Sequence, residues 1–266
     1  MKLCMMSSVL GFDNPREVVD TAVYCGMEAV DWIFPSTRDI DPLFLRQLTV
    51  DAGLKIAAYT PLFSAFINGD EAWRDKFLVE LDKAVAMSAP VMMIPPFAPE
   101  NQKSLAEDRE RWKEFYSWAA PEALSAGVRL TLEPTGLLKS PVTTSGELLE
   151  ILDAVPQLRL TLDYGNMATA GEAPESIRKL SGKIVHIHLK DWLISSEQRP
   201  GSTLKRCGKY FANAMIGTGN LDVRGSWDVL SALDRESFVN LETADFSGKL
   251  PVKEALKQVS DNLRNW

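Results

Sequence analysis

Apolar runs alternate with amphipathic segments along the whole chain. Eight short runs are rich in β-branched and other apolar residues, as in strands that are buried on both faces. Between these runs, apolar residues recur every three or four positions, which predicts helices with one buried face. The predicted strands cover residues 3–6, 29–32, 55–60, 91–94, 129–133, 158–163, 184–189 and 238–242, and the predicted helices cover residues 14–26, 41–53, 71–88, 104–126, 143–154, 174–180, 226–234 and 252–263.

Capping and helix-breaking residues refine this pattern. Asn14-Pro15 and Asp41-Pro42 each combine a capping side chain with a proline, which favours the first turn of a helix. Pro121 lies inside the long helical segment 104–126 and is expected to kink or divide it. A long polar loop is expected over residues 195–219.

Eight strands that alternate with about eight helices indicate a parallel sheet with helical crossovers. This is the repeat count of a (β/α)₈ TIM barrel, and we predict one α/β barrel domain over residues 1–266. The competing architecture is an open, doubly wound sheet. That fold normally has a glycine-rich phosphate turn after the first strand, and no such turn is present here.

The amino-acid composition argues against several classes of function. The 266 residues are 45% hydrophobic and 24% charged, as in an ordinary globular protein, and the formal net charge of −7 argues against nucleic-acid or membrane binding. No apolar run reaches the roughly 18 residues of a membrane span, and the apolar run at the start is shorter than a signal peptide is expected to have. The three cysteines are scattered along the sequence without a pairing motif, which predicts a reducing, cytoplasmic location.

The last four predicted strands each carry polar side chains near the carboxyl end. Strand alternation places the two polar residues of each triplet on one face, which in a barrel is the interior. The triplets are Thr131-Leu132-Glu133, Thr161-Leu162-Asp163, His186-Ile187-His188 and Asn240-Leu241-Glu242. Because the carboxyl ends of barrel strands form the active face, we expect the final residue of each triplet to converge there.

Glu133, Asp163, His188 and Glu242 therefore form a predicted metal site. Three carboxylates need a compensating cation, and an oxygen-rich set with one imidazole suits Mn²⁺, Mg²⁺ or Co²⁺, with Zn²⁺ as a further candidate. The first residues of the triplets, Thr131, Thr161, His186 and Asn240, are expected to orient these ligands from the layer below. The alternative for the only two histidines of the chain is a structural role in the core.

Substrate contacts are less sharply indicated. Lys190 shares a strand face with His188 and is expected either to hold a substrate oxygen or to pair with a nearby carboxylate. Trp32 and Trp192 lie near strand ends, where they would stack on a sugar or pack within loops. Arg206 belongs to the long loop, which would either close over an anionic substrate or stay solvated.

Five motifs carry a family resemblance: Leu132-Glu133-Pro134, Leu162-Asp163, His186-Ile-His-Leu-Lys-Asp191, Gly217-Thr-Gly-Asn-Leu-Asp222 and Leu241-Glu242. They resemble the sugar phosphate isomerase/epimerase family of the xylose-isomerase-like TIM barrel superfamily. This resemblance implies one divalent metal on the four predicted ligands and an acid/base pair of Glu133 and Glu242. It further implies proton transfer through an enediolate of a sugar, sugar phosphate or keto-polyol. A homo-oligomeric state stays open.

Two departures from the family pattern concern the substrate. Ketose 3-epimerases of the family often have a histidine three residues after the metal aspartate, where this chain has Asn166, which we assign to substrate binding by its position. They also often have a second glutamate soon after the first, and residues 135–139 contain none. Two histidines are too few for the three-zinc endonuclease of the superfamily. A metal-dependent dehydratase and a non-catalytic sugar-binding protein remain as alternatives.

Overall fold

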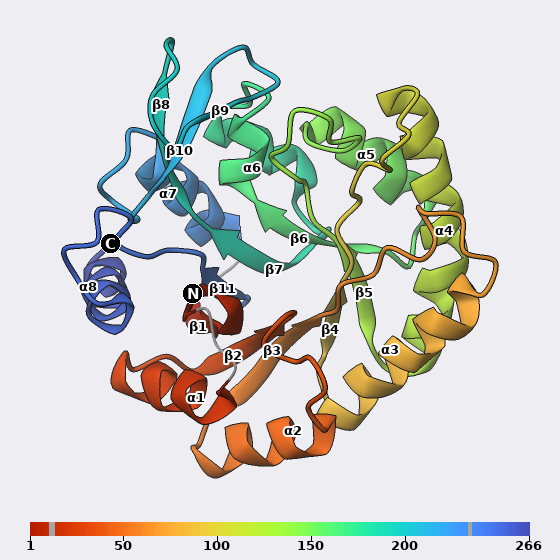
Figure 1. Ribbon diagram of the computed structural model, residues 1–266, viewed down its shortest axis with the longest axis horizontal. Coiled ribbons are helices and arrows are strands. Elements are labelled where there is room, and N and C mark those ends of the chain that lie inside the picture. The colour runs from red at the N-terminus through yellow and green to blue at the C-terminus, as the bar shows by residue number, and fades with distance from the viewer. Residues whose placement is uncertain (11–13, 234–235) are drawn as a thin grey trace.

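The computed structural model describes residues 1–10, 14–233 and 236–266. Eight parallel strands close into a barrel in the order β1-β11-β7-β6-β5-β4-β3-β2, and helices surround it (Figure 1). The predicted (β/α)₈ barrel is therefore confirmed. The barrel strands are β1 (Lys2–Met6), β2 (Ala29–Ile33), β3 (Lys55–Thr60), β4 (Val91–Met93), β5 (Arg129–Leu132), β6 (Arg159–Asp163), β7 (Ile184–Leu189) and β11 (Phe238–Leu241).

The helices follow the predicted capping signals. The side chains of Asn14 and Asp41 accept hydrogen bonds from the first-turn N–H groups of Arg16 and Leu43, so each offsets an unpaired donor at a helix start. The α-helices are α1 (Pro15–Tyr24), α2 (Pro42–Asp51), α3 (Trp73–Met87), α4 (Leu105–Ser125), α5 (Ser145–Ala154), α6 (Tyr164–Ala168), α7 (Val223–Leu233) and α8 (Val252–Arg264), and the 3₁₀ helices are η1 (Ser7–Leu10) and η2 (Pro174–Leu180).

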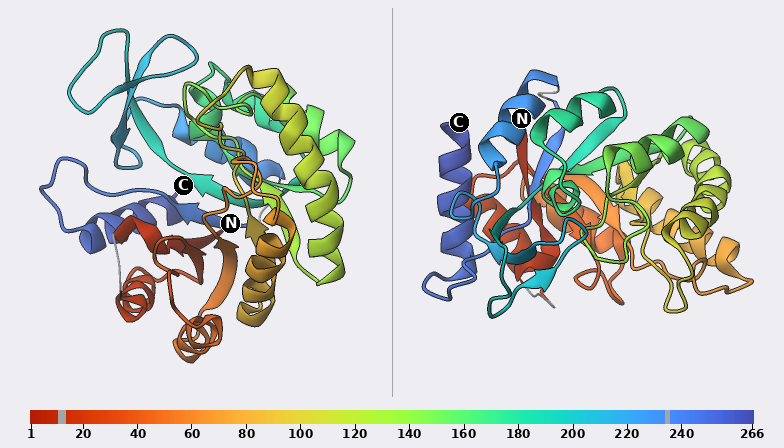
Figure 2. Two further views of the ribbon diagram at one scale, coloured as in Figure 1. Left: turned by 45° about the vertical axis from the view of Figure 1, so that its right-hand side comes forward. Right: turned by 90° about the horizontal axis from the view of Figure 1, so that it is seen from above.

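Two expectations about these elements need correction. Of the two effects expected for Pro121, division of the helix is wrong, because α4 runs without a break from Leu105 to Ser125. The expected polar loop 195–219 instead contains most of a three-stranded antiparallel sheet, which projects from the barrel (Figure 2). Its strands are β8 (Asp191–Ser195), β9 (Thr203–Leu204) and β10 (Tyr210–Ala214).

Two further helix expectations need adjustment. The short α6 was not expected from the sequence, and segment 174–180 forms a 3₁₀ helix. The helix expected over 226–234 begins three residues earlier, at Val223, and its expected end at Asp234 lies outside the described residues.

The strands separate two kinds of side chain. Ile187 and Leu189 of β7 face outward into the main apolar core between barrel and helices, whereas His186 and His188 alternate with them and face inward. Strand register aligns the inward residues in layers, because His188 is paired with Asp163 of β6 and with Asn240 of β11. The barrel thus has an apolar jacket and a polar interior near the carboxyl ends of its strands.

Candidate metal centre

The four residues predicted to bind metal lie together. One side-chain ligand atom each from Glu133, Asp163, His188 and Glu242 falls within 4.8 Å of the others. Glu133, Asp163 and His188 are buried, and Glu242 is partly exposed, which leaves the group open on one side. These residues come from, or directly follow, β5, β6, β7 and β11, so the group sits at the carboxyl face of the barrel.

Unpaired atoms show that the group fits a cation. Glu133 Oε1, Asp163 Oδ2 and His188 Nδ1 are buried and lack a hydrogen-bond partner. His188 Nδ1 lies 2.7 Å from Glu133 Oε1, so these two atoms point at nearly the same place. Buried polar atoms are rarely left without partners. Three oxygens and one imidazole nitrogen, most of them without partners, are a donor set that a divalent cation would satisfy.

Lys190 contributes a positive charge to this group. Its ammonium lies 2.6 Å from Glu242 Oε2 and 3.0 Å from Asp163 Oδ2, so the expected carboxylate pairing of Lys190 is present. Despite burial, which favours the neutral amine, these carboxylates raise the pKa of Lys190. The side chain passes close to the main chain of α6, because a Cβ built on Gly165 would lie 2.4 Å from Lys190 Cγ. Glycine at position 165 therefore makes room for Lys190.

Burial and mutual repulsion set the protonation of the ligands. Burial, and then Glu133 and Glu242, raise the pKa of Asp163 to about 7, against the opposing effect of Lys190. Glu133 is equally enclosed, but the neighbouring His188 outweighs burial and lowers its pKa. The pKa of His188 is raised, because the nearby carboxylates of Glu133 and Asp31 outweigh the effect of burial. The raised pKa of Asp163 shows that the carboxylates repel one another, and a bound divalent cation would offset that repulsion.

Asp31 is a buried carboxylate next to His188 that sequence reasoning missed. Asp31 Oδ2 accepts hydrogen bonds from His186 Nε2 at 2.8 Å and from Asn240 Nδ2 at 2.8 Å, and it lies 3.2 Å from His188 Nε2. Asp31 is fully buried, and these imidazole contacts outweigh burial and hold its pKa below its usual range. In a neutral His188, contact with Asp31 favours the proton on Nε2, so that Nδ1 is the nitrogen that a cation in the centre would meet.

The layer below the ligands is polar, as expected. Thr131 Oγ1 and Thr161 Oγ1 are 2.8 Å apart, and His186 and Asn240 both bond to Asp31. His186 is not among the four converging ligand residues. Its role in supporting that group stays a prediction. The sequence signal for Asp31 was strand alternation, because Asp31 lies two positions after Ala29 and so on the same face of β2. In the structure, Ala29 packs with Cys4 and Ala57 and not with the main core.

The side chains of Trp32 and Arg206 both make hydrogen bonds within the protein. Trp32 is fully buried and donates from Nε1 to Thr49 Oγ1 of α2 at 3.1 Å, because alternation turns it outward when Asp31 faces inward. The sugar-stacking role expected for Trp32 is therefore wrong. Arg206 makes two 2.8 Å hydrogen bonds to Glu147 of α5, so its guanidinium is engaged within the protein.

Asn166 and Trp192 lie beside the centre. Asn166 donates from its backbone N–H to Asp163 Oδ1 at 2.8 Å and from its amide to the Pro134 carbonyl at 2.9 Å. Trp192 donates from Nε1 to the Gly165 carbonyl at 2.9 Å, and Lys190 Nζ lies 5.8 Å from the centre of its ring. Their assignment to substrate binding stays a prediction, in a position next to the ligands.

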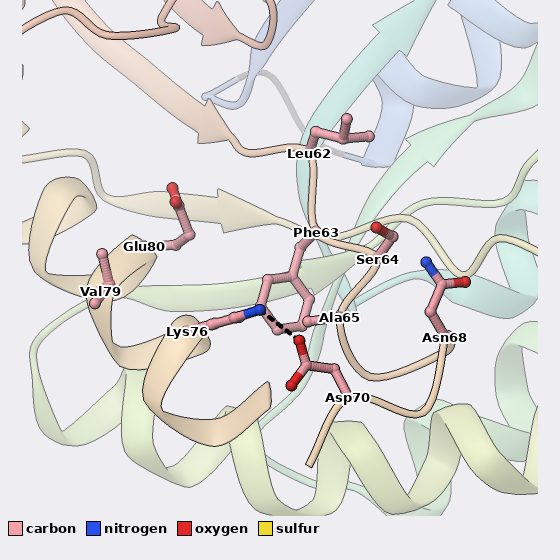
Figure 3. Close-up of a pocket in the computed structure, with 9 residues that line it drawn as sticks. All are labelled: Leu62, Phe63, Ser64, Ala65, Asn68, Asp70, Lys76, Val79 and Glu80. Atoms are coloured by element: carbon pink, nitrogen blue, oxygen red, sulfur yellow. Dashed lines mark hydrogen bonds and ion pairs between the residues drawn. The ribbon is translucent and has the colours of Figure 1, made fainter. Parts of the chain in front are cut away.

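Pockets elsewhere do not include these residues. A pocket of about 400 Å³ lies between the segment after β3 and helix α3 (Figure 3). Its floor contains Phe63, and an ion pair between Lys76 and Asp70 crosses it. None of the four ligand residues lines this pocket. The convergence of those four residues places the candidate chemistry at the barrel mouth.

Across the described ranges, no helix combines the length and apolar character that crossing a membrane requires.

Comparison with known proteins places this geometry in context. A family model described as xylose isomerase-like TIM barrel matches residues 19–266. No curated protein matches the sequence.

Solved structures share the fold. They include an IolI protein with a zinc atom (18% identity, TM-score 0.79, 99% of this chain and 96% of that chain) and a D-psicose 3-epimerase with D-tagatose from Clostridium cellulolyticum H10 (14%, 0.75, 100% and 97%). A xylose isomerase-like TIM barrel/4-hydroxyphenylpyruvate dioxygenase fusion protein is 17% identical, with a TM-score of 0.79. This chain is covered over 99% of its length and spans 42% of that fusion protein.

Proposed function

Because this chain belongs to the xylose isomerase-like TIM barrel family, we propose that it is a divalent-metal-dependent isomerase or epimerase of a small sugar, sugar phosphate or keto-polyol. The observation that carries this proposal is the convergence of Glu133, Asp163, His188 and Glu242, in which three buried ligand atoms have no hydrogen-bond partner and meet only ion-pair contacts. The zinc atom in the IolI structure supports a metal centre, and the D-psicose 3-epimerase structure supports an epimerase.

The four converging residues would hold the cation. When bound, a divalent cation supplies Lewis-acid stabilisation for negative charge that develops on a carbonyl oxygen. His188 would bind it through Nδ1, while Asp31 keeps the Nε2 side in place. This leaves the chain's remaining groups to handle the proton on the carbon next to the carbonyl.

Glu133 and Glu242 would move that proton. They follow β5 and β11, which are separated by β6 and β7 in the closed barrel, so the two carboxylates approach the centre from different sides. One carboxylate would remove the proton and the other would return it on the opposite face. Lys190 lies 2.6 Å from Glu242 Oε2 and holds that carboxylate at the barrel mouth.

Exchange of carbon-bound hydrogen tests the proposal without knowledge of the product. Protein loaded with Mn²⁺ would be incubated in D₂O with a set of keto-sugars and inososes, and substrate deuteration would be followed by NMR. We expect at least one member to exchange at the carbon next to its carbonyl. Absence of exchange across the set with Mn²⁺, Mg²⁺, Co²⁺ and Zn²⁺ would overturn the proposal, and a mass loss of one water would identify a dehydratase.

A further inference from the structure

The turn between β9 and β10 is fixed onto the barrel. Arg206 in this turn makes its paired hydrogen bonds to Glu147 near the start of α5, and although burial opposes this, those bonds help to lower the pKa of Glu147 to about 2. The next residue, Cys207, donates from its backbone N–H to the Thr169 carbonyl at 2.9 Å, just after α6. The projecting sheet therefore returns to the barrel mouth and holds Lys205 there.

The Lys205 side chain is largely buried although no charged group pairs with it in the described part of the chain. It is 7% exposed, and its ammonium lies 5.3 Å from the centre of the Trp192 ring. Within the part of the chain that the structure describes, this ammonium forms no ion pair and donates no hydrogen bond. Most of the Lys205 side chain is covered, but its ammonium keeps some contact with water, since it does not belong to the fully buried polar atoms that lack a partner. Lysines with so little exposed surface usually have a charged partner, and the aromatic ring contributes only a weak attraction.

Lys190 can be compared directly with Lys205, because both ammonium groups lie near the Trp192 ring. Its ammonium lies 5.8 Å from the same Trp192 ring, but Asp163 and Glu242 neutralise it. For Lys205, burial and then the positive charge of Lys190 lower the pKa, and no carboxylate opposes these effects. Lys205 thus brings uncompensated positive charge to the region beside the candidate metal centre.

We propose that Lys205, with the Trp192 ring and Lys190 nearby, binds an anionic oxygen group at the end of the substrate away from its carbonyl. A phosphate and a carboxylate share this chemistry, since both accept charge-assisted hydrogen bonds from an ammonium. The indole N–H of Trp192 already bonds to Gly165, which leaves the ring to pack on substrate carbons. The role of this group within a sugar substrate rests on the proposed function, but the anion binding itself does not.

Three small molecules that share a three-carbon skeleton test whether negative charge, and not shape alone, determines binding. Binding of glycerol, glycerate and glycerol 3-phosphate would be measured by calorimetry on metal-stripped protein, so that the result does not depend on the metal centre or on turnover. We expect one or both anions to bind at least about tenfold more tightly than glycerol, which corresponds to about 1.4 kcal/mol. Stronger binding of glycerol 3-phosphate points to a sugar phosphate, and stronger binding of glycerate points to a sugar acid.

Variants assign the site. Lys205→Met should abolish the preference for anions, and Lys205→Arg should retain it. Lys209→Met is the matched control, because it removes the same charge from an exposed position in the same turn. The inference is overturned if wild-type protein binds glycerol as well as both anions, or if Lys205→Met keeps the preference. If Lys205→Met fails to fold, the wild-type comparison and Lys205→Arg still decide. Anion binding without any deuterium exchange would contradict the proposed function alone.

Discussion

Replacing Asp31 with asparagine should weaken metal binding, although Asp31 does not belong to the group of Glu133, Asp163, His188 and Glu242 that would hold the cation. Asp31 Oδ2 lies 2.8 Å from His186 Nε2, 2.8 Å from Asn240 Nδ2 and 3.2 Å from His188 Nε2. Asparagine keeps the shape but removes the charge that fixes the His188 tautomer. Loss of the hydrogen-bond partner of a metal-bound histidine typically lowers affinity by about 10–100-fold. This corresponds to about 1.4–2.8 kcal/mol for Mn²⁺ binding.

Titration calorimetry with Mn²⁺ measures this change, and Asp191→Asn is the matched control. Asp191 is also a buried carboxylate, and it accepts backbone N–H bonds from Trp192, Gly217 and Gly219 at 2.7–3.0 Å. Both variants should lose stability, because each removes charge-assisted hydrogen bonds. Only Asp31→Asn should lose Mn²⁺ affinity. Equal affinity in folded Asp31→Asn and wild-type protein would refute the role assigned to Asp31.

Three further predictions follow from the same centre and its surroundings. Purified protein should contain one divalent metal per chain by elemental analysis, and Asp163→Ala and His188→Ala should each lose most of it; undiminished content in both would contradict the site. The metal binds the carboxylate form of Asp163, whose pKa is raised to about 7. Protonation of Asp163 should therefore lower the Mn²⁺ affinity about tenfold for each pH unit below 7, and Asp163 should have no effect on the affinity above pH 7. A flat calorimetric profile from pH 8 to 5.5 would show that no such proton is displaced. Arg206→Met should lower the free energy of unfolding by about 1–3 kcal/mol in urea titrations and leave Mn²⁺ affinity unchanged. The difference should shrink as pH falls from about 4.5 toward 2, because the paired Glu147 has a pKa lowered to about 2, and a difference that persists at pH 2 would contradict the ion-pair explanation.

Much of the barrel could be predicted because its signals are local. Asn14 and Asp41 cap helices through their own side chains, and the strand that holds His186 and His188 follows from alternation along six residues. The grouping of Glu133, Asp163, His188 and Glu242 also follows from local strand ends once the barrel is assumed. Parallel strands bring their carboxyl ends to one face.

The remaining features depend on contacts between distant segments. Asp31 is a single polar residue in an apolar strand, and its partners lie 155 to 209 positions away. The sequence does not show which residues of β2 face inward, and alternation turns Trp32 outward once Asp31 faces inward. The sheet β8–β10 was missed because its strands are short and partly exposed, and Lys205 becomes buried only when that sheet returns to the barrel.

Proton transfer by the two glutamates is the central claim, and one kinetic comparison tests it most directly. Glu133→Gln and Glu242→Gln keep an oxygen donor but remove the base, and Glu150→Gln makes the same change at an exposed site on α5. Deuterium exchange from D₂O into substrate would be measured at saturating Mn²⁺. General acid–base groups contribute about 10²–10⁴-fold to rate, so we expect both centre variants to lose at least about 10²-fold while Glu150→Gln matches wild type. Near-wild-type exchange in both Glu133→Gln and Glu242→Gln, with metal bound, would show that the glutamates serve only as ligands and would contradict the mechanism.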